Sequence, residues 1–160
     1  MIYNILRHND KQLLRPTSKF DFNNSDITPL DLASNLAETM LYNNGIGLAA
    51  NQCGLDYSVF VMLADELIPV FNPLIVDFSS EAIILEEGCL SCDSVLVKVK
   101  RPRRIKVRYT EPNGNVVTRV FDGITSRVFQ HEYDHLQGII HLDKTSFIHR
   151  ERALKKLKHK

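Results

Sequence analysis

Residues 130–135 contain the pattern H-E-x-x-H within a stretch whose apolar residues recur at helical spacing. In a helix, His131 and His135 project from one face about one turn apart, so both imidazoles can bind a single metal ion. Glu132 could then take a proton from a water that the metal activates, without binding the metal itself. A chance match on a solvated helix is the alternative, but the apolar flanks favour a half-buried helix whose polar groups need partners.

The composition is that of one soluble globular domain, which we expect to span residues 1–160. The chain is 44% hydrophobic and 24% charged, and its formal charge of +1 gives no case for binding DNA or a membrane surface. Residues 1–8 resemble neither a secretory signal nor a transit peptide, and no apolar run approaches membrane-spanning length. Three cysteines, an odd number, favour a reducing compartment, so we expect a cytoplasmic protein.

The order of predicted elements indicates an α+β fold, with small antiparallel or mixed sheets around a central metal-binding helix. Thr28 and Pro29 predict the start of a first helix, which residues 43–45 end. Gly138 ends the H-E-x-x-H helix, and a basic helix closes the chain. The predicted strands are 58–63, 67–71, 81–86, 95–100, 104–110 and 116–121, the last two joined as a hairpin, and the second and third helices are 123–137 and 146–158.

A catalytic metal site needs a third protein ligand and one open position, and the sequence offers two candidates for that ligand. His141 completes H-E-x-x-H-x-x-G-x-x-H, the pattern of metzincin proteases, although we expect it in an extended segment after Gly138. Those proteases also need a methionine turn downstream, and the methionines of this chain all precede the histidines. Cys89 offers a thiolate from a loop that follows a predicted strand.

Three segments together carry a resemblance to a known family. They read G-I-G-L-A-A-N-Q at residues 45–52, E-G-C-L-S at 87–91 and Q-H-E-Y-D-H-L at 130–136. In this order and with similar separations, they resemble the three signatures of peptide deformylase. The resemblance extends over most of the chain, from about residue 5 to residue 143.

The resemblance implies a metal-dependent hydrolase that removes the formyl group from N-formyl-methionine on nascent peptides and releases formate. Cys89, His131 and His135 would bind one divalent metal, with Fe²⁺ as the native ion and Zn²⁺, Ni²⁺ or Co²⁺ as possible substitutes. Glu132 would act as the acid–base group. The side-chain amide of Gln52 and the backbone N–H of Leu90 would stabilise negative charge on the formyl oxygen.

The same resemblance places substrate-binding residues around the metal. A peptide would pair with the backbone of Gly45, Ile46 and Gly47, although these glycines also suit a plain helix-ending turn. Ile46 and Val128 would border a pocket for the methionine side chain, with Val128 as an ordinary core residue in the alternative interpretation. Glu87 and Arg101 would lie near the mouth of the pocket as a pair, or else are surface charges.

Cys92 departs from the family pattern, which usually has a small aliphatic residue there, followed by proline. With Cys89 it forms a C-x-x-C, so Cys89, Cys92, His131 and His135 could instead form a closed structural zinc site. Cys92 could also be a buried small residue, or form a disulfide with Cys89 on oxidation, for which Cys53 is a second possible partner.

The basic tail, about residues 146–160, is either a solvated helical end or a contact with ribosomal RNA. The ribosome contact would place the enzyme where formylated chains emerge. Together these features predict a monomer in a bacterial cytoplasm, encoded by the bacterium or by a phage.

Overall fold

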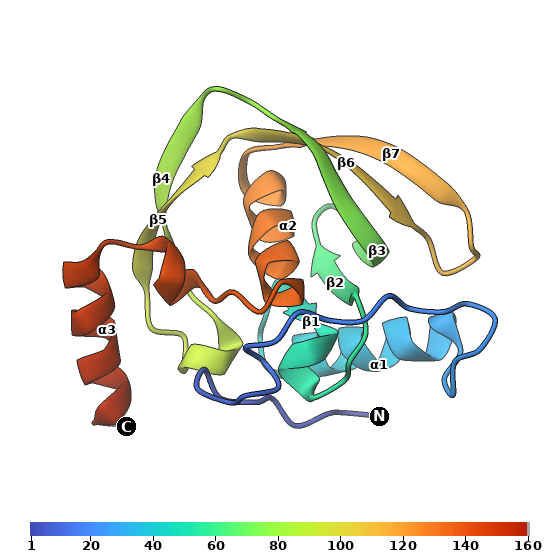
Figure 1. Ribbon diagram of the computed structural model, residues 1–160, viewed down its shortest axis with the longest axis horizontal. Coiled ribbons are helices and arrows are strands. Elements are labelled where there is room, and N and C mark those ends of the chain that lie inside the picture. Colours follow the sequence, from blue (N-terminus) through green and yellow to red (C-terminus); the bar gives the residue numbers. More distant parts are fainter. Residues whose placement is uncertain (160) are drawn as a thin grey trace.

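The H-E-x-x-H pattern lies on α2 (Gly123–Leu136), which stands between a five-stranded sheet and a two-stranded ribbon (Figure 1). The computed structural model describes residues 1–159. Its helices and strands form one α+β arrangement, as predicted. The arrangement leaves one face of α2 against the sheet and turns the rest toward the ribbon and the loops.

The other elements follow one another in chain order with short connections. Within residues 1–159, no helix is both long enough and apolar enough to cross a bilayer. The remaining elements are α1 (Pro29–Tyr42), β1 (Gly47–Ala49), β2 (Val59–Leu63), β3 (Leu67–Phe78), β4 (Ala82–Glu87), β5 (Val97–Pro102), β6 (Arg104–Thr110), β7 (Val116–Asp122) and α3 (Phe147–Lys158), with 3₁₀ turns at Ala50–Cys53, Leu90–Cys92 and His141–Lys144.

The large sheet has the strand order β1-β2-β3-β6-β7, and β4 pairs with β5 in the separate ribbon. Every pairing among these strands is antiparallel, so the described sheets are antiparallel rather than mixed. The predicted hairpin joins β6 and β7, and Gly114 in its turn has a φ of 89°, which glycine adopts without strain. β1 lies at the end of the strand order, which gives the sheet one edge beside α2.

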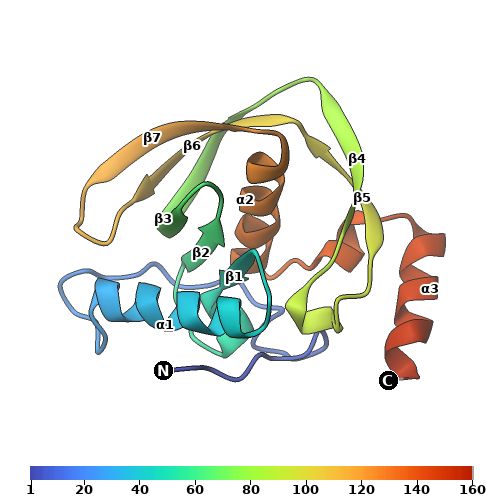
Figure 2. The same ribbon diagram turned by 180° about the vertical axis from the view of Figure 1, so that it is seen from behind.

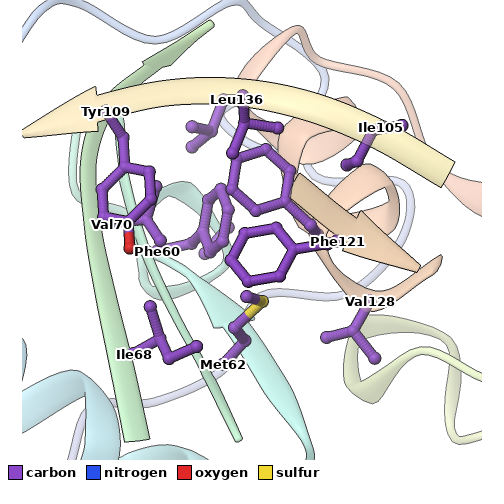
Figure 3. Packing of buried hydrophobic residues seen from close by; sticks show 12 residues of the cluster. Phe60, Met62, Ile68, Val70, Ile105, Tyr109, Phe121, Val128 and Leu136 are labelled. Atoms are coloured by element: carbon purple, nitrogen blue, oxygen red, sulfur yellow. The ribbon is translucent and has the colours of Figure 1, made fainter. Parts of the chain in front are cut away.

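Strand β2 is buried on both faces and joins two parts of the core. Phe60 and Met62 point toward α2, where they meet Phe121 and Leu136 (Figure 3). The alternate residue Val61 instead packs with α1. Because side chains alternate across a strand, the apolar run in β2 can serve both helices at once.

The first helix begins as its sequence predicts. The Oγ1 atom of Thr28 accepts a hydrogen bond from the backbone N–H of Asp31, and Pro29 occupies the first turn, where a missing N–H costs nothing. Buried leucines and Met40 on one face pack against β1 and β2. This packing fixes the segment after the helix, residues 45–52, beside α2.

Several elements differ from the sequence prediction: β1 was not predicted, and β5 lies two residues later than the predicted strand 95–100. β3 continues to Phe78 instead of ending at 71, because Asn72 adopts a φ of 49° and the strand resumes after a bulge. The Asn72 side chain stabilises the bulge by bonding both backbone groups of Phe20. His141 begins a 3₁₀ turn and is not in an extended segment.

The basic tail forms α3, which packs against β5 at one side of the molecule (Figure 2). Its apolar face buries Ala153 and Leu157, so the described part of the tail is docked on the domain and is not only a solvated end. The Oγ atom of Ser146 accepts a hydrogen bond from the backbone of His149 and caps the helix. Lys160, the last residue of the predicted tail, lies outside the described residues.

We expect Phe129→Ala to lower the free energy of unfolding by about 3–5 kcal/mol, because its ring is fully buried among Phe60, Tyr109 and Phe121. Urea unfolding followed by circular dichroism measures the change. Phe147→Ala is the matched control: that ring is 76% exposed, so we expect a loss below about 1 kcal/mol. Equal losses in the two variants would contradict the assignment of Phe129 to the core beneath α2.

Candidate metal centre and active site

Cys89, His131 and His135 place three metal-binding atoms within 4.8 Å of one another, and all three side chains are largely buried. The Nε2 atoms of the two histidines are 3.2 Å apart, and the Cys89 Sγ lies 3.4 Å from the His135 Nε2. The histidines come from successive turns of α2, and Cys89 comes from the loop after β4. The third donor atom beside the histidine pair is therefore that of Cys89.

The two ring nitrogens of His141 contact Val95 and Cys92. Its Nε2 lies 3.1 Å from the carbonyl oxygen of Val95, and its Nδ1 lies 3.9 Å from the Cys92 Sγ. The metzincin interpretation, in which His141 completes the set, is wrong because the donor atom of His141 groups with Cys89 and Cys92 and not with the two histidines of α2.

Glu132 lines the same pocket as Cys89 and His131. Its side chain is buried, and within residues 1–159 its Oε2 has no hydrogen-bond partner. Burial raises the pKa of this carboxyl to about 7. A carboxyl poised near neutrality can both accept and return a proton.

Gly47 of β1 lies against this carboxylate. A Cβ atom at position 47 would come within 2.8 Å of the Glu132 Cδ, closer than side chains tolerate. The glycine therefore serves a close approach between backbone and carboxylate.

Gln52 lies beside Cys89, on the 3₁₀ turn after β1. Its Oε1 accepts a hydrogen bond of 2.9 Å from the backbone N–H of Ala49, which fixes which end of the amide carries the donors. Its Nε2 then points toward Cys89 and Ser91, at 3.6 Å from the thiol sulfur and 3.2 Å from the hydroxyl. Leu90 follows Cys89 directly and lines the same pocket as Gln52.

Glu87 connects the ribbon to α2 through buried charges. Its Oε1 lies 2.9 Å from the His131 Nδ1, so this ring nitrogen is the donor and Nε2 remains free to bind a metal. The Arg101 guanidinium donates two hydrogen bonds to the same carboxylate, at 2.6 and 3.0 Å. Burial disfavours the charge on Glu87, but the bonds from His131 and Arg101 outweigh it and hold the pKa of this carboxyl well below its usual range.

Two further charges complete this network, and the sequence did not single them out. Arg127 on α2 donates to Glu87 and to the carbonyls of Ile83 and Val99. Asp134, on the same helix, accepts a bond of 2.8 Å from Arg101. Glu87 and Arg101 are only 6% and 5% exposed, so the interpretation of them as surface charges is wrong.

A pocket of about 370 Å³ opens over the donor atoms and Glu132. Residues 44–47 form one wall and the end of β4 forms another, with α2 between them. Gly45, Ile46, Gly47 and Val128 all line it, as does Glu87, whereas Arg101 lies behind Glu87 rather than in the described lining. Val128 is 7% exposed and belongs to the core, and its contact with a methionine side chain stays a prediction.

The closed structural zinc site expected as an alternative does not assemble. Cys92 gathers with Cys89 and His141 and not with the histidine pair of α2. Cys53 packs in a separate part of the core, under α1, and burial raises the pKa of its thiol to about 12. The disulfide between Cys89 and Cys92 stays a prediction. Cys53 packs in a different hydrophobic cluster from these two cysteines.

The donor set fits a divalent metal. One thiolate and two imidazoles suit a borderline-soft ion, His131 has its second nitrogen anchored by a carboxylate, and the pocket leaves an open side for water. Glu132, whose Oε2 has no partner within the described residues, lines the same pocket. Fold and site together define a metal-dependent hydrolase.

Comparison with known proteins identifies the family. The family model described as polypeptide deformylase matches residues 2–151. The peptide deformylase of Thermotoga petrophila is 40% identical over 144 residues, which cover 89% of this chain and 85% of the relative. The peptide deformylase of Synechocystis is 38% identical over 141 residues, covering 84% and 74%. The chain belongs to the polypeptide deformylase family, and the predicted activity, metal-dependent removal of the formyl group from nascent peptides, is confirmed at the level of that family.

Solved structures agree with this assignment. The crystal structure of peptide deformylase from Thermotoga maritima is similar with a TM-score of 0.82 and 37% identity, covering 91% of this chain and 99% of that one. A peptide deformylase from Legionella pneumophila gives a TM-score of 0.92 at 28% identity, covering 99% and 95%. The α+β fold is thus shared along nearly the whole chain.

We expect Glu87→Gln to lower the free energy of unfolding by about 3–5 kcal/mol, because it leaves two buried guanidinium groups short of negative charge. It should also weaken metal binding by about 10–100-fold, since the His131 ring loses its charged anchor. Urea unfolding and competition with a metal chelator measure the two effects. Glu86→Gln, at the exposed neighbouring position, is the matched control; a Glu87 variant that behaves like it would refute the role of the network.

Proposed function

We propose that Cys89, His131 and His135 hold the metal with which this chain removes the formyl group from N-formyl-methionine peptides, and that Glu132 is its acid–base group. The observation that carries the proposal is the unpaired, buried Oε2 of Glu132 in the pocket that also contains the grouped thiol and imidazole donors. A carboxylate kept free of partners in such a place has a use only if a ligand or water enters the pocket. α2 is then the central metal-binding helix of the domain.

Fe²⁺ is the proposed native ion, and Zn²⁺, Ni²⁺ or Co²⁺ could occupy the same donors. The metal, when bound, would polarise the formyl group and activate a water molecule for attack. Hydrogen bonding by Cys92 and burial raise the pKa of the Cys89 thiol, so a cation that binds there must displace its proton.

Glu132 moves the proton of the reaction. Its Oε2 accepts the proton from the water as the new C–O bond forms, and delivers it to the amine nitrogen as the C–N bond breaks. Formate and a free amino terminus are the products. The Gln52 amide and the Leu90 backbone N–H donate to the formyl oxygen as negative charge develops there. The bond from Ala49 supports this role, because it keeps the Gln52 amide oriented with N–H toward the pocket.

The peptide would bind along residues 45–47, which lead into β1. This strand ends the strand order of the large sheet, so residues 45–47 can pair with an extended peptide as an additional strand. Ile46 and Val128 line the pocket where the methionine side chain would lie. Glu87 borders the same pocket, while Arg101 acts through it by holding the carboxylate in place.

The remaining expectations concern the setting of the enzyme. We propose a single-domain monomer, residues 1–160, that works in a bacterial cytoplasm and is encoded by the bacterium or by a phage. α3 presents Lys155, Lys156 and Lys158 outside its buried face, which supports a contact with ribosomal RNA.

We expect the parent, purified anaerobically with Fe²⁺, to release formate from formyl-Met-Ala-Ser, and Glu132→Ala to be slower by roughly 10²–10⁴-fold at equal metal content. A coupled formate assay with metal analysis of each sample measures this. Glu151→Ala, which removes an exposed carboxylate on α3, should retain the parental rate. A fully metallated parent that releases no formate would refute the proposed activity, and a fast Glu132 variant would refute its role alone.

We expect deletion of residues 150–160 to reduce cosedimentation with ribosomes at low salt, and physiological salt to weaken the parental binding, because lysine–phosphate contacts release counterions. Since the deletion also removes the buried Leu157, replacing Lys155, Lys156 and Lys158 with glutamine is the matched variant that keeps the helix docked. Unchanged binding of both variants would exclude the tail as the contact.

A further inference from the structure

Cys92 and His141 form a buried pair beside the catalytic thiol, and the proposed reaction uses neither residue. Cys92 is 0% exposed and His141 is 1% exposed. The Cys92 Sγ lies 3.9 Å from the His141 Nδ1, and both atoms lie within 4.8 Å of the Cys89 Sγ. The molecule therefore has a second group of three metal-binding atoms, and Cys89 belongs to both groups.

The loop after Cys89 is folded so that this second group can form. Leu90–Cys92 make one 3₁₀ turn, and the backbone N–H groups of Cys92 and Ser94 both bond the Cys89 carbonyl. Asp93 and Ser94 follow with φ of 49° and 57°, the left-handed conformation that residues other than glycine seldom adopt. This tight turn directs the Cys92 side chain back toward Cys89.

His141 has the orientation of a metal-binding imidazole. A carbonyl oxygen only accepts hydrogen bonds, so the 3.1 Å contact with Val95 makes Nε2 the protonated nitrogen of the ring. The lone pair on Nδ1 then faces the two sulfurs. Anchoring one ring nitrogen on a backbone carbonyl while the other stays free is how proteins orient histidine ligands.

The donor atoms favour a particular class of ion. Two thiolates and one imidazole are soft ligands, which select Cu(I) or Zn(II). Zn(II) takes a fourth ligand, usually water in an open site, but Cys92 and His141 are shut off from solvent. A three-coordinate, monovalent soft ion suits this environment better.

We propose that Cys89, Cys92 and His141 form a buried three-coordinate site for Cu(I). Binding displaces the thiol proton of Cys92 to solvent, and also that of Cys89 where no metal already holds this sulfur, and leaves the His141 ring neutral. Because Cys89 is shared, Cu(I) at this site competes with the resident divalent metal for the same thiolate. This competition depends on the metal site proposed above, whereas the Cu(I) site itself does not.

The site is tested with the nickel-loaded full chain under anaerobic conditions, titrated with Cu(I) buffered by a chromophoric chelator. Bound copper and released nickel are measured by mass spectrometry. We expect the parent to bind one Cu(I) and release nickel, and Cys92→Val and His141→Phe to bind Cu(I) at least about tenfold more weakly. Cys53→Val, which removes the third thiol away from the site, should behave like the parent.

Both site variants should still hold nickel and release formate, which separates failure of this proposal from failure of the proposed function. X-ray absorption of the copper-loaded parent gives an answer that does not depend on how the variants fold. Two sulfur neighbours and one nitrogen support the site; one sulfur and two nitrogens place the copper on Cys89, His131 and His135 and overturn it. Copper affinity in Cys92→Val equal to that of the parent also overturns it.

Discussion

The buried carboxylate of Glu87 receives hydrogen bonds from Arg101 on β5 and from Arg127 and His131 on α2, so one side chain joins the ribbon to the helix. Those bonds also influence where the Cys89 thiol lies. The ribbon ends at Glu87, and Cys89 follows two residues later, so the position of the thiol relative to the histidines depends on where the carboxylate is held. The positive charges of Arg101 and Arg127 offset the negative charges of Glu87 and Asp134, which lowers the free-energy cost of burying these ionised groups. The arrangement of the candidate metal donors thus depends on the charged residues that contact His131 and Glu87 from behind.

Much of this arrangement can be predicted from the sequence, because the decisive patterns are local. The spacing of His131 and His135 predicts a shared helical face, and the Thr28–Pro29 start predicts α1. Even the burial of Arg101 could have been read from the alternation in β5, where it shares the inward face with the buried valines. What the sequence leaves open is long-range pairing. Arg127 carries no local feature that marks its contact with Glu87, forty positions earlier. Likewise, the bulge at Asn72 that lets β3 continue depends on contacts with Phe20, far away in the sequence.

The choice between Cys89 and His141 illustrates the same limit. Both residues occur at spacings known from metal enzymes, and periodicity does not distinguish them. The fold does, because it groups the Cys89 sulfur with the two histidines of α2, whereas it groups His141 with Cys89 and Cys92 and not with those histidines. The matches to the deformylase signatures favour Cys89 because those signatures reflect this fold. They give no account of Cys92, whose Sγ lies 3.9 Å from the Nδ1 of His141, a residue 49 positions later in the sequence.

The two-sided burial of β2 has a consequence for how the chain matures. One face of the strand is covered by α1, which precedes it, but the other face waits for α2, which is made much later. During synthesis, Phe60 and Met62 therefore remain uncovered until the helix that bears both histidines has left the ribosome. Closing the core and positioning the histidines are then the same event. The candidate metal donors are therefore brought together only when the core on this face of β2 is covered.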